Sequence, residues 1–107
     1  MKILVVSNSN MGIYKFRKEL LDKFIGLKHE ITVVSPFDEY TDKISEMKLK
    51  VISVEIDRRG KSPIKDFKLF RKYKKIMKQE KPDVVLTYTI KPNIYGGMAA
   101  KSLKIPY

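Results

Sequence analysis

The sequence contains no cysteine and no tryptophan, and it has a single histidine, His29. Without thiols the chain can form neither a disulfide framework nor a zinc site built on cysteine. No apolar run approaches the roughly 20 residues that a membrane-spanning helix needs. The opening run, residues 2–6, is also too short for the core of a signal peptide. These absences favour a cytoplasmic protein that is held together by a buried core.

Acidic residues are also scarce, with 12 Asp and Glu against 23 Lys and Arg, and the formal net charge is +11. The excess is concentrated between Arg58 and Lys81, where eleven basic residues accompany only two acidic ones. A charge of this size indicates an anionic partner, such as nucleic acid, lipid head groups or a phosphorylated substrate.

The pattern of apolar residues predicts an α/β fold. A chain of 107 residues with 43% apolar and 33% charged residues has the composition of a single globular domain. Short β-type runs alternate with amphipathic segments, which is typical of parallel strands joined by crossover helices. The expected strands are residues 2–6, 30–34, 51–56 and 83–87, and the expected helices are about residues 13–25, 40–47, 63–79 and 94–103. We therefore predict a Rossmann-like three-layer sandwich with a parallel sheet in the order 3-2-1-4.

Two of the expected helices have well-marked apolar faces, which we expect to lie in the core. In the helix at residues 13–25, helical spacing groups one set of side chains toward the sheet. This set is Ile13, Phe16, Leu20, Phe24 and Leu27. In the helix at residues 63–79, apolar side chains occupy one half of the helical wheel and basic side chains occupy the other. The apolar set is Phe67, Leu69, Phe70, Tyr73, Ile76 and Met77.

Polar loops follow the first and fourth expected strands. The first loop is Ser7–Gly12, and the second lies within the stretch Thr87–Gly97. Because the carboxyl ends of parallel strands meet at one edge of the sheet, where ligands commonly bind, both loops are candidate binding loops. Pro92 suits the first position of a helix, where free N–H groups attract anions, and Lys91 adds a full charge. The alternatives are a plain polar turn for the first loop, and helix capping with a solvated lysine for the second.

No catalytic residue, metal site or cofactor is predicted. The first loop lacks the three spaced glycines of a dinucleotide-binding fingerprint, and the chain contains no P-loop. No pair of carboxylates or cluster of metal ligands stands out. His29 precedes the second strand, so it belongs at the opposite edge of the sheet from the two loops. Arg58 and Arg59 suit bidentate phosphate binding, although paired arginines on a loop are often only solvated.

Five stretches share their order and spacing with a known family. They are Lys-Ile-Leu-Val-Val at residues 2–6, His-Glu-Ile-Thr-Val-Val at 29–34, Arg-Arg-Gly at 58–60, Lys-Pro-Asp-Val-Val at 81–85 and Thr-Tyr-Thr-Ile-Lys-Pro-Asn-Ile-Tyr-Gly at 87–96. Together they resemble the N-terminal domain of family-four glycosyltransferases over essentially the whole chain. The subgroup to which the chain is most similar is bacterial and extends undecaprenyl-diphosphate-linked sugars during capsule, O-antigen or glycan assembly.

The resemblance implies a GT-B enzyme of two Rossmann-like domains, which transfers a hexose-type sugar from a nucleotide-sugar donor with retention of configuration. In this family the N-terminal domain chiefly binds the acceptor, and the C-terminal domain holds most of the donor. Residues 1–107 would then be an acceptor-binding domain that lacks the donor domain and is inactive alone. The closing residues 105–107 resemble the approach to a fifth strand, which also suggests a fragment. An alternative is a non-catalytic subunit that completes a split glycosyltransferase with another chain.

The resemblance also implies which residues contact the substrates. Gly12 stands where the family often has paired glycines beside the donor diphosphate, so we expect the same contact there. The expected acceptor contacts are Asn8, Ser9, Asn10, Arg59, Thr89, Lys91 and Asn93.

A lipid-linked acceptor would give the basic helix face a function at the membrane. We expect this face to dock electrostatically on the inner face of the cell membrane through Lys65, Lys68, Arg71, Lys72, Lys75 and Lys78. The alternatives are a face that is only solvated, or a nucleic-acid-binding module. Against nucleic acid, the aromatic side chains of this helix are expected on its apolar face rather than between the basic residues. No nucleic-acid-binding motif is recognised either.

Overall fold

The computed structural model describes residues 1–56, 63–89 and 91–107, except for the side chain of Phe16. Arg59, which was predicted to contact the acceptor, and its neighbour Arg58 lie outside the described residues.

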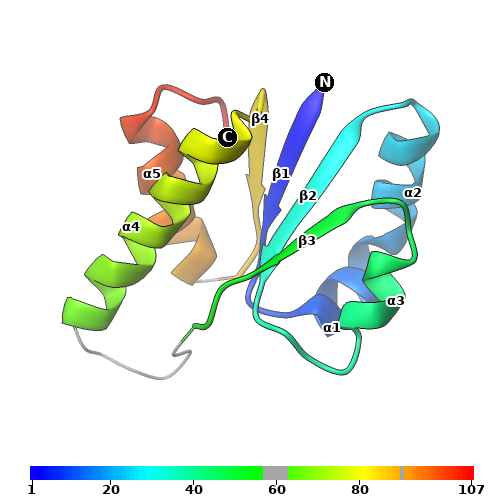
Figure 1. Ribbon diagram of the computed structural model, residues 1–107, viewed down its shortest axis with the longest axis horizontal. Helices are drawn as coiled ribbons and strands as arrows, with labels where there is room; N and C mark the ends of the chain where they lie inside the picture. The colour runs from blue at the N-terminus through cyan, green and yellow to red at the C-terminus, as the bar shows by residue number, and fades with distance from the viewer. Residues whose placement is uncertain (57–62, 90) are drawn as a thin grey trace.

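Four parallel strands form the centre of the molecule (Figure 1). They are β1 (Lys2–Val6), β2 (Glu30–Ser35), β3 (Lys50–Ser53) and β4 (Val84–Thr87). Their order, β3-β2-β1-β4, confirms the predicted topology. In the register of the sheet, Val5 of β1 lies beside Val33 of β2 and Leu86 of β4. The carboxyl ends of β1 and β4 are therefore neighbours.

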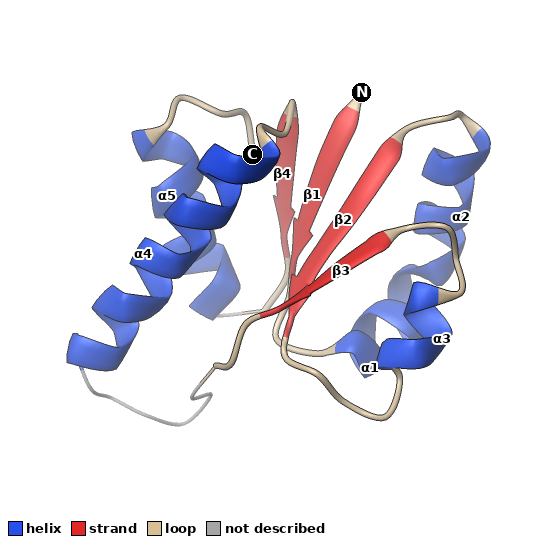
Figure 2. Cartoon of the chain, in the orientation of Figure 1, coloured by secondary structure: helices blue, strands red, loops and turns tan. Residues whose placement is uncertain are grey.

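Helices cover both faces of this sheet, which gives the predicted three-layer sandwich (Figure 2). On one face lie α1 (Asn10–Gly12), the π-helical segment η1 (Ile13–Arg17), α2 (Lys18–Gly26) and α3 (Thr41–Ser45). On the other lie α4 (Pro63–Glu80), the π-helical segment η2 (Pro92–Gly96) and α5 (Gly97–Ser102). None of the described helices is both long and apolar enough to span a membrane.

Strand β1 is covered on both faces, which explains its unbroken apolar run. Side chains alternate along a strand, so Ile3 and Val5 pack under α2 and α3. Leu4 and Val6 point the other way and pack under α4 and α5. Gly96 lets the chain after β4 approach the sheet closely, because a Cβ atom there would come within 3.1 Å of the Thr87 Cγ2 atom.

The first helix buries a different face from the one predicted. Ile13 is buried as expected, but Leu20 is 38% exposed and Leu27 is 61% exposed, whereas Leu21 is buried. The cause is η1, because a π-helical turn contains more residues than an α-helical turn. The apolar face beyond η1 is therefore displaced by about one residue, from Leu20 to Leu21.

The apolar face of α4 is narrower than predicted. Leu69, Tyr73 and Met77 are buried, but Phe67 is 59% exposed, so its assignment to the core was wrong. Phe67 precedes Leu69 by two residues, which places it about 160° away around a helix of 3.6 residues per turn. The phenylalanine therefore lies among the basic residues of the helix.

Candidate functional site

The two polar loops meet at the carboxyl edge of the sheet, as their positions after β1 and β4 predicted. Between them is a pocket of about 140 Å³, which we call the β1–β4 pocket. Its described lining is Ser7, Asn8, Ser9, Gly12, Ile13, Arg17, Tyr88 and Thr89. The sheet edge thus brings together Asn8, Ser9 and Thr89, three of the predicted acceptor contacts, with Gly12.

The N–H groups at the start of the first helix are used within the chain. Ser9 has an extended backbone, and its Oγ atom accepts a hydrogen bond of 3.1 Å from the Gly12 N–H. The Oδ2 atom of Asp38 accepts hydrogen bonds of 2.9 Å and 3.1 Å from the N–H groups of Asn10 and Met11. A carboxylate of the protein therefore occupies the position that a bound anion takes at other helix starts.

Asn10, one of the predicted acceptor contacts, has a structural role in this conformation. Its side chain is 0% exposed. The amide nitrogen donates hydrogen bonds to the Thr41 Oγ1 atom at 2.8 Å and to the Pro36 carbonyl at 3.2 Å. The amide oxygen accepts a hydrogen bond from the Ser35 hydroxyl. The side chain ties the first loop to the loop after β2, so in this conformation it has no accessible atom for a ligand.

Two residues that the sequence analysis did not select complete the β1–β4 pocket. The guanidinium carbon of Arg17 lies 4.6 Å from the centroid of the Tyr88 ring, which is a cation–π contact. Thr89 follows Tyr88 with a φ angle of 75°, which is rare for a β-branched residue. Tyr88 was within the stretch that was singled out, but Arg17 was not predicted as a site residue. No sequence signal indicated its position, because that position depends on the π-helical turn.

Lys91 lies away from the β1–β4 pocket. Its Nζ atom is 2.9 Å from the Oδ1 atom of Asp66 on α4, and both side chains are mostly buried. The Tyr95 hydroxyl donates a hydrogen bond of 3.0 Å to the Oδ2 atom of the same carboxylate. This bond raises the pKa of the Tyr95 phenol above its ordinary value. Asn93, also predicted as a contact, is exposed on η2 and is absent from the described lining of the β1–β4 pocket.

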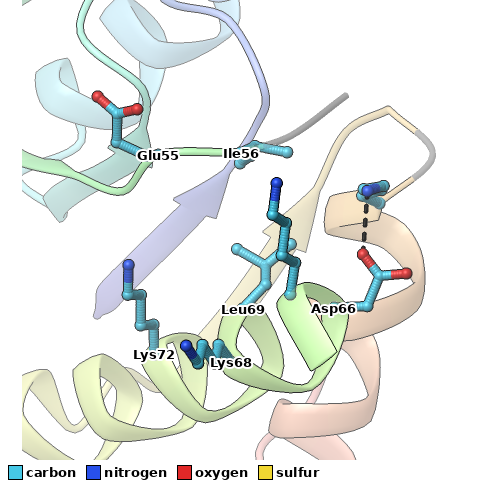
Figure 3. A pocket seen from close by; sticks show the side chains of 8 residues that line it. Glu55, Ile56, Asp66, Lys68, Leu69 and Lys72 are labelled. Carbon is cyan, nitrogen blue, oxygen red and sulfur yellow. Dashed lines mark hydrogen bonds and ion pairs between the residues drawn. The ribbon is translucent and has the colours of Figure 1, made fainter. Parts of the chain in front are cut away.

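A second and larger pocket, of about 350 Å³, lies between α4 and the segment that follows β3 (Figure 3). We call it the α4 pocket. Its described lining is Glu55, Ile56, Lys65, Asp66, Lys68, Leu69, Lys72 and Lys91. Lys65, Lys68 and Lys72, which were predicted to face a membrane, thus lie beside this pocket.

The other basic residues of α4 lie along a groove on the outer side of the helix. The groove has a volume of about 480 Å³ and is lined by Phe67, Phe70, Arg71, Lys74, Lys75 and Lys78. Ile64, near the start of the helix, is 69% exposed. The predicted basic face therefore divides into a side toward the α4 pocket and an outer side that carries exposed apolar groups.

Comparison with known proteins identifies the family. The family described as "Glycosyl transferase 4-like" matches residues 2–107. Over 107 residues the chain is 36% identical to the N,N'-diacetylbacillosaminyl-diphospho-undecaprenol alpha-1,3-N-acetylgalactosaminyltransferase of Campylobacter jejuni, and it spans 28% of that protein's length.

Two solved structures share the fold over 98% of this chain. MurG from Acinetobacter baumannii superimposes with a TM-score of 0.79 at 18% identity, and the match covers 33% of its length. A glycosyltransferase from Rickettsia africae superimposes with a TM-score of 0.81 at 18% identity, and the match covers 28% of its length. Together with the family match, these findings confirm the predicted resemblance, and the chain belongs to the glycosyl transferase 4-like family.

Proposed function

We propose that this chain is the acceptor-binding domain of a retaining glycosyltransferase that adds a sugar to a lipid-diphosphate-linked acceptor. The observation that carries the proposal is the β1–β4 pocket, which combines polar loop groups with an arginine at the carboxyl edge of the sheet. The name of the Campylobacter jejuni relative supports the acceptor class, since that enzyme acts on a diphospho-undecaprenol-linked sugar.

In this proposal, Asn8, Ser9 and Thr89 contact the acceptor, and Gly12 approaches the diphosphate of the nucleotide-sugar donor. A Cβ atom on Gly12 would meet only the Ser9 side chain, at 3.8 Å, so Gly12 leaves room for a ligand without being required by the fold. A second Rossmann-like domain, in the same or another chain, holds the rest of the donor and completes the enzyme. Lys91 and Asn93 do not belong to the described lining of the β1–β4 pocket, so the proposal assigns them no contact with the ligand.

The acceptor role can be tested by titrating the isotopically labelled protein with a short-chain prenyl diphosphate that carries a sugar. We expect the NMR amide signals of Asn8, Ser9 and Thr89 to shift, because these residues line the β1–β4 pocket. The amide of His29 precedes β2 at the opposite edge of the sheet and serves as the internal control. Shifts that are absent from the pocket, or equally large at both edges, would count against the proposal.

We also propose that the outer side of α4 docks on the anionic inner face of the cell membrane. Arg71, Lys74, Lys75 and Lys78 supply positive charge there, and each charge near such a surface contributes about 1 kcal/mol. Phe67 adds an exposed ring, so docking combines charge with shallow apolar insertion rather than charge alone. A membrane-bound acceptor would then meet a domain that is already held at the membrane surface.

The exposed position of Phe67 also bears on the nucleic-acid alternative. Its ring lies 6.3 Å from that of Phe70, and both border the same groove as the basic residues, so aromatic and basic groups do alternate on this face. The membrane remains the favoured partner, because the exposed Ile64 on the same helix has no aromatic face for a base to stack on. Filter binding with short DNA and RNA separates the two alternatives.

A further inference from the structure

One basic side chain, that of Arg17, lines the β1–β4 pocket and was not among the predicted contacts. Arg17 is the last residue of η1, and its φ and ψ angles of −122° and 0° depart from helical values. Among the described residues that line the pocket, Arg17 alone carries a charge. Lys91, the cation predicted for this site, instead forms an ion pair with Asp66 beside the α4 pocket.

Tyr88 holds the guanidinium group of Arg17 in a defined place. Tyr88 packs against the hydrophobic cluster under α2 and α3, and its N–H donates a hydrogen bond of 2.9 Å to the Val6 carbonyl. The backbone of Tyr88 is thus fixed to the end of β1, and the guanidinium carbon of Arg17 lies over its ring, 4.6 Å from the centroid. Stacking on a ring face orients a guanidinium group without using any of its five N–H donors.

The N–H donors of Arg17 are available for a ligand. Within the described part of the chain, no carboxylate forms an ion pair with Arg17. The nearby carboxylate of Asp38 is engaged by the N–H groups of Asn10 and Met11. A planar group with several donors matches a phosphate, which can accept two parallel hydrogen bonds from it.

We propose that Arg17, positioned by Tyr88, binds a phosphate group in the β1–β4 pocket, with Asn8 of the first loop donating a further hydrogen bond. The inference rests on the proposed function and identifies the group that holds the diphosphate. The same chemistry is present in the prenyl diphosphate of an acceptor, in the nucleotide diphosphate of a donor and in free pyrophosphate. Arg17 therefore selects for phosphate-containing ligands as a class, and the experiment below distinguishes an acceptor diphosphate, a donor diphosphate and free pyrophosphate.

The test is calorimetric titration of the full chain with farnesyl diphosphate, with UDP and with inorganic pyrophosphate. We expect Arg17→Gln to weaken farnesyl diphosphate binding by about tenfold or more, because a charge-assisted hydrogen-bonded contact is lost. Arg17→Lys keeps the charge but loses the planar fork, so an intermediate loss of about threefold is expected. Lys23→Gln is the matched control, since it makes the same charge change on the exposed part of α2.

Tyr88 is tested as a positioning residue by a pair of variants. Tyr88→Leu removes the ring face and should weaken binding by about threefold to tenfold, whereas Tyr88→Phe keeps the face and should bind as the unmodified chain does. Thermal unfolding of each variant shows whether the fold is kept. Equal losses in both Tyr88 variants would overturn the positioning role.

The outcomes separate this inference from the proposed function. Binding of farnesyl diphosphate that is no more sensitive to Arg17→Gln than to Lys23→Gln overturns the role of Arg17 and leaves the acceptor function standing. Binding of UDP alone, with dependence on Arg17, supports the phosphate site but assigns it to the donor and overturns the acceptor function. Absence of binding by all three probes overturns both.

Discussion

Tyr73 places a hydroxyl group inside the apolar core beneath α4. The residue is 1% exposed, and its hydroxyl oxygen has no hydrogen-bond partner among the described residues. Burial raises the pKa of this phenol far above its ordinary value, so the group stays neutral. A buried polar group without a partner costs roughly 1–3 kcal/mol, so the ring of Tyr73 stabilises the fold and its hydroxyl does not.

We expect Tyr73→Phe to raise the free energy of unfolding by about 1 kcal/mol, because it removes the unpartnered hydroxyl and keeps the ring. Urea denaturation followed by circular dichroism measures the change. Tyr107→Phe, which removes the hydroxyl of an exposed tyrosine, should alter stability by less than about 0.5 kcal/mol. A clear loss of stability in Tyr73→Phe would show that the hydroxyl has a partner after all.

At the level of single residues, the basic side chain that lines the β1–β4 pocket is Arg17, whereas the sequence pointed to Lys91. Lys91 was predicted to bind the acceptor because it stands at a helix start. Such a prediction uses only the charge of a residue and the residues next to it in the chain. It does not show that Asp66, 25 residues away, pairs with that lysine. Arg17 had no comparable local signal, although it lines the pocket with three of the predicted acceptor contacts.

Among the elements, the segment from Asn10 to Gly26 is the most informative. Its π-helical part shifts the buried face from Leu20 to Leu21 and ends at Arg17, so one local irregularity affects both the core and the site. The second π-helical segment, η2, begins three residues after Thr89. Of the two, only η1 contributes described residues to the lining of the β1–β4 pocket, namely Ile13 and Arg17, and π-helical turns are frequent at functional sites.

Asp38 joins the loop after β2 to the start of this first helix. We expect Asp38→Ala to lower the free energy of unfolding by about 1–2 kcal/mol, because it removes the acceptor for the N–H groups of Asn10, Met11 and Tyr40. Asp38→Asn keeps one acceptor oxygen and should cost less. Both are measured by urea denaturation, with Glu39→Ala as the control for the change in charge. Equal stability of Asp38→Ala and Glu39→Ala would contradict the capping role.

At the scale of the whole molecule, the basic residues that give the net charge of +11 lie on more than one face of the protein. Some of the lysines of α4 border the α4 pocket, and others line the outer groove with Phe67. The helices on the opposite face of the sheet also carry exposed lysines, including Lys18 and Lys23. Only variants that compare these faces at equal net charge can show which one docks.

For the vesicle test, we expect the double variant Arg71→Glu with Lys75→Glu to bind phosphatidylglycerol-containing vesicles at least about 30-fold more weakly than the unmodified chain. The expected loss follows from about 1 kcal/mol for each charge removed from the surface. Co-sedimentation at several salt concentrations measures the binding. Phe67→Ser should remove the part of the binding that persists at high salt, because insertion of a ring is not screened.

The matched control for vesicle binding is Lys18→Glu with Lys23→Glu, which makes the same change in net charge on the α2 face. Its binding should fall much less than that of the α4 variant. Equal losses in the two variants would mean that vesicle binding follows net charge alone, and the proposed docking face would be wrong. Stronger competition by short RNA than by vesicles would favour the nucleic-acid alternative.

The sequence by itself determined the strands, their order and the edge at which the two loops meet. These features follow from the alternation of apolar runs with amphipathic segments and from the right-handed crossover between parallel strands, which are local or general properties of a chain. Tertiary structure decided which side chains are available at that edge. Asn10 is buried, Lys91 is paired with Asp66, and Arg17 lies over Tyr88. Each outcome depends on the rotation of a helix, or on a partner distant in the sequence, and no local pattern encodes either.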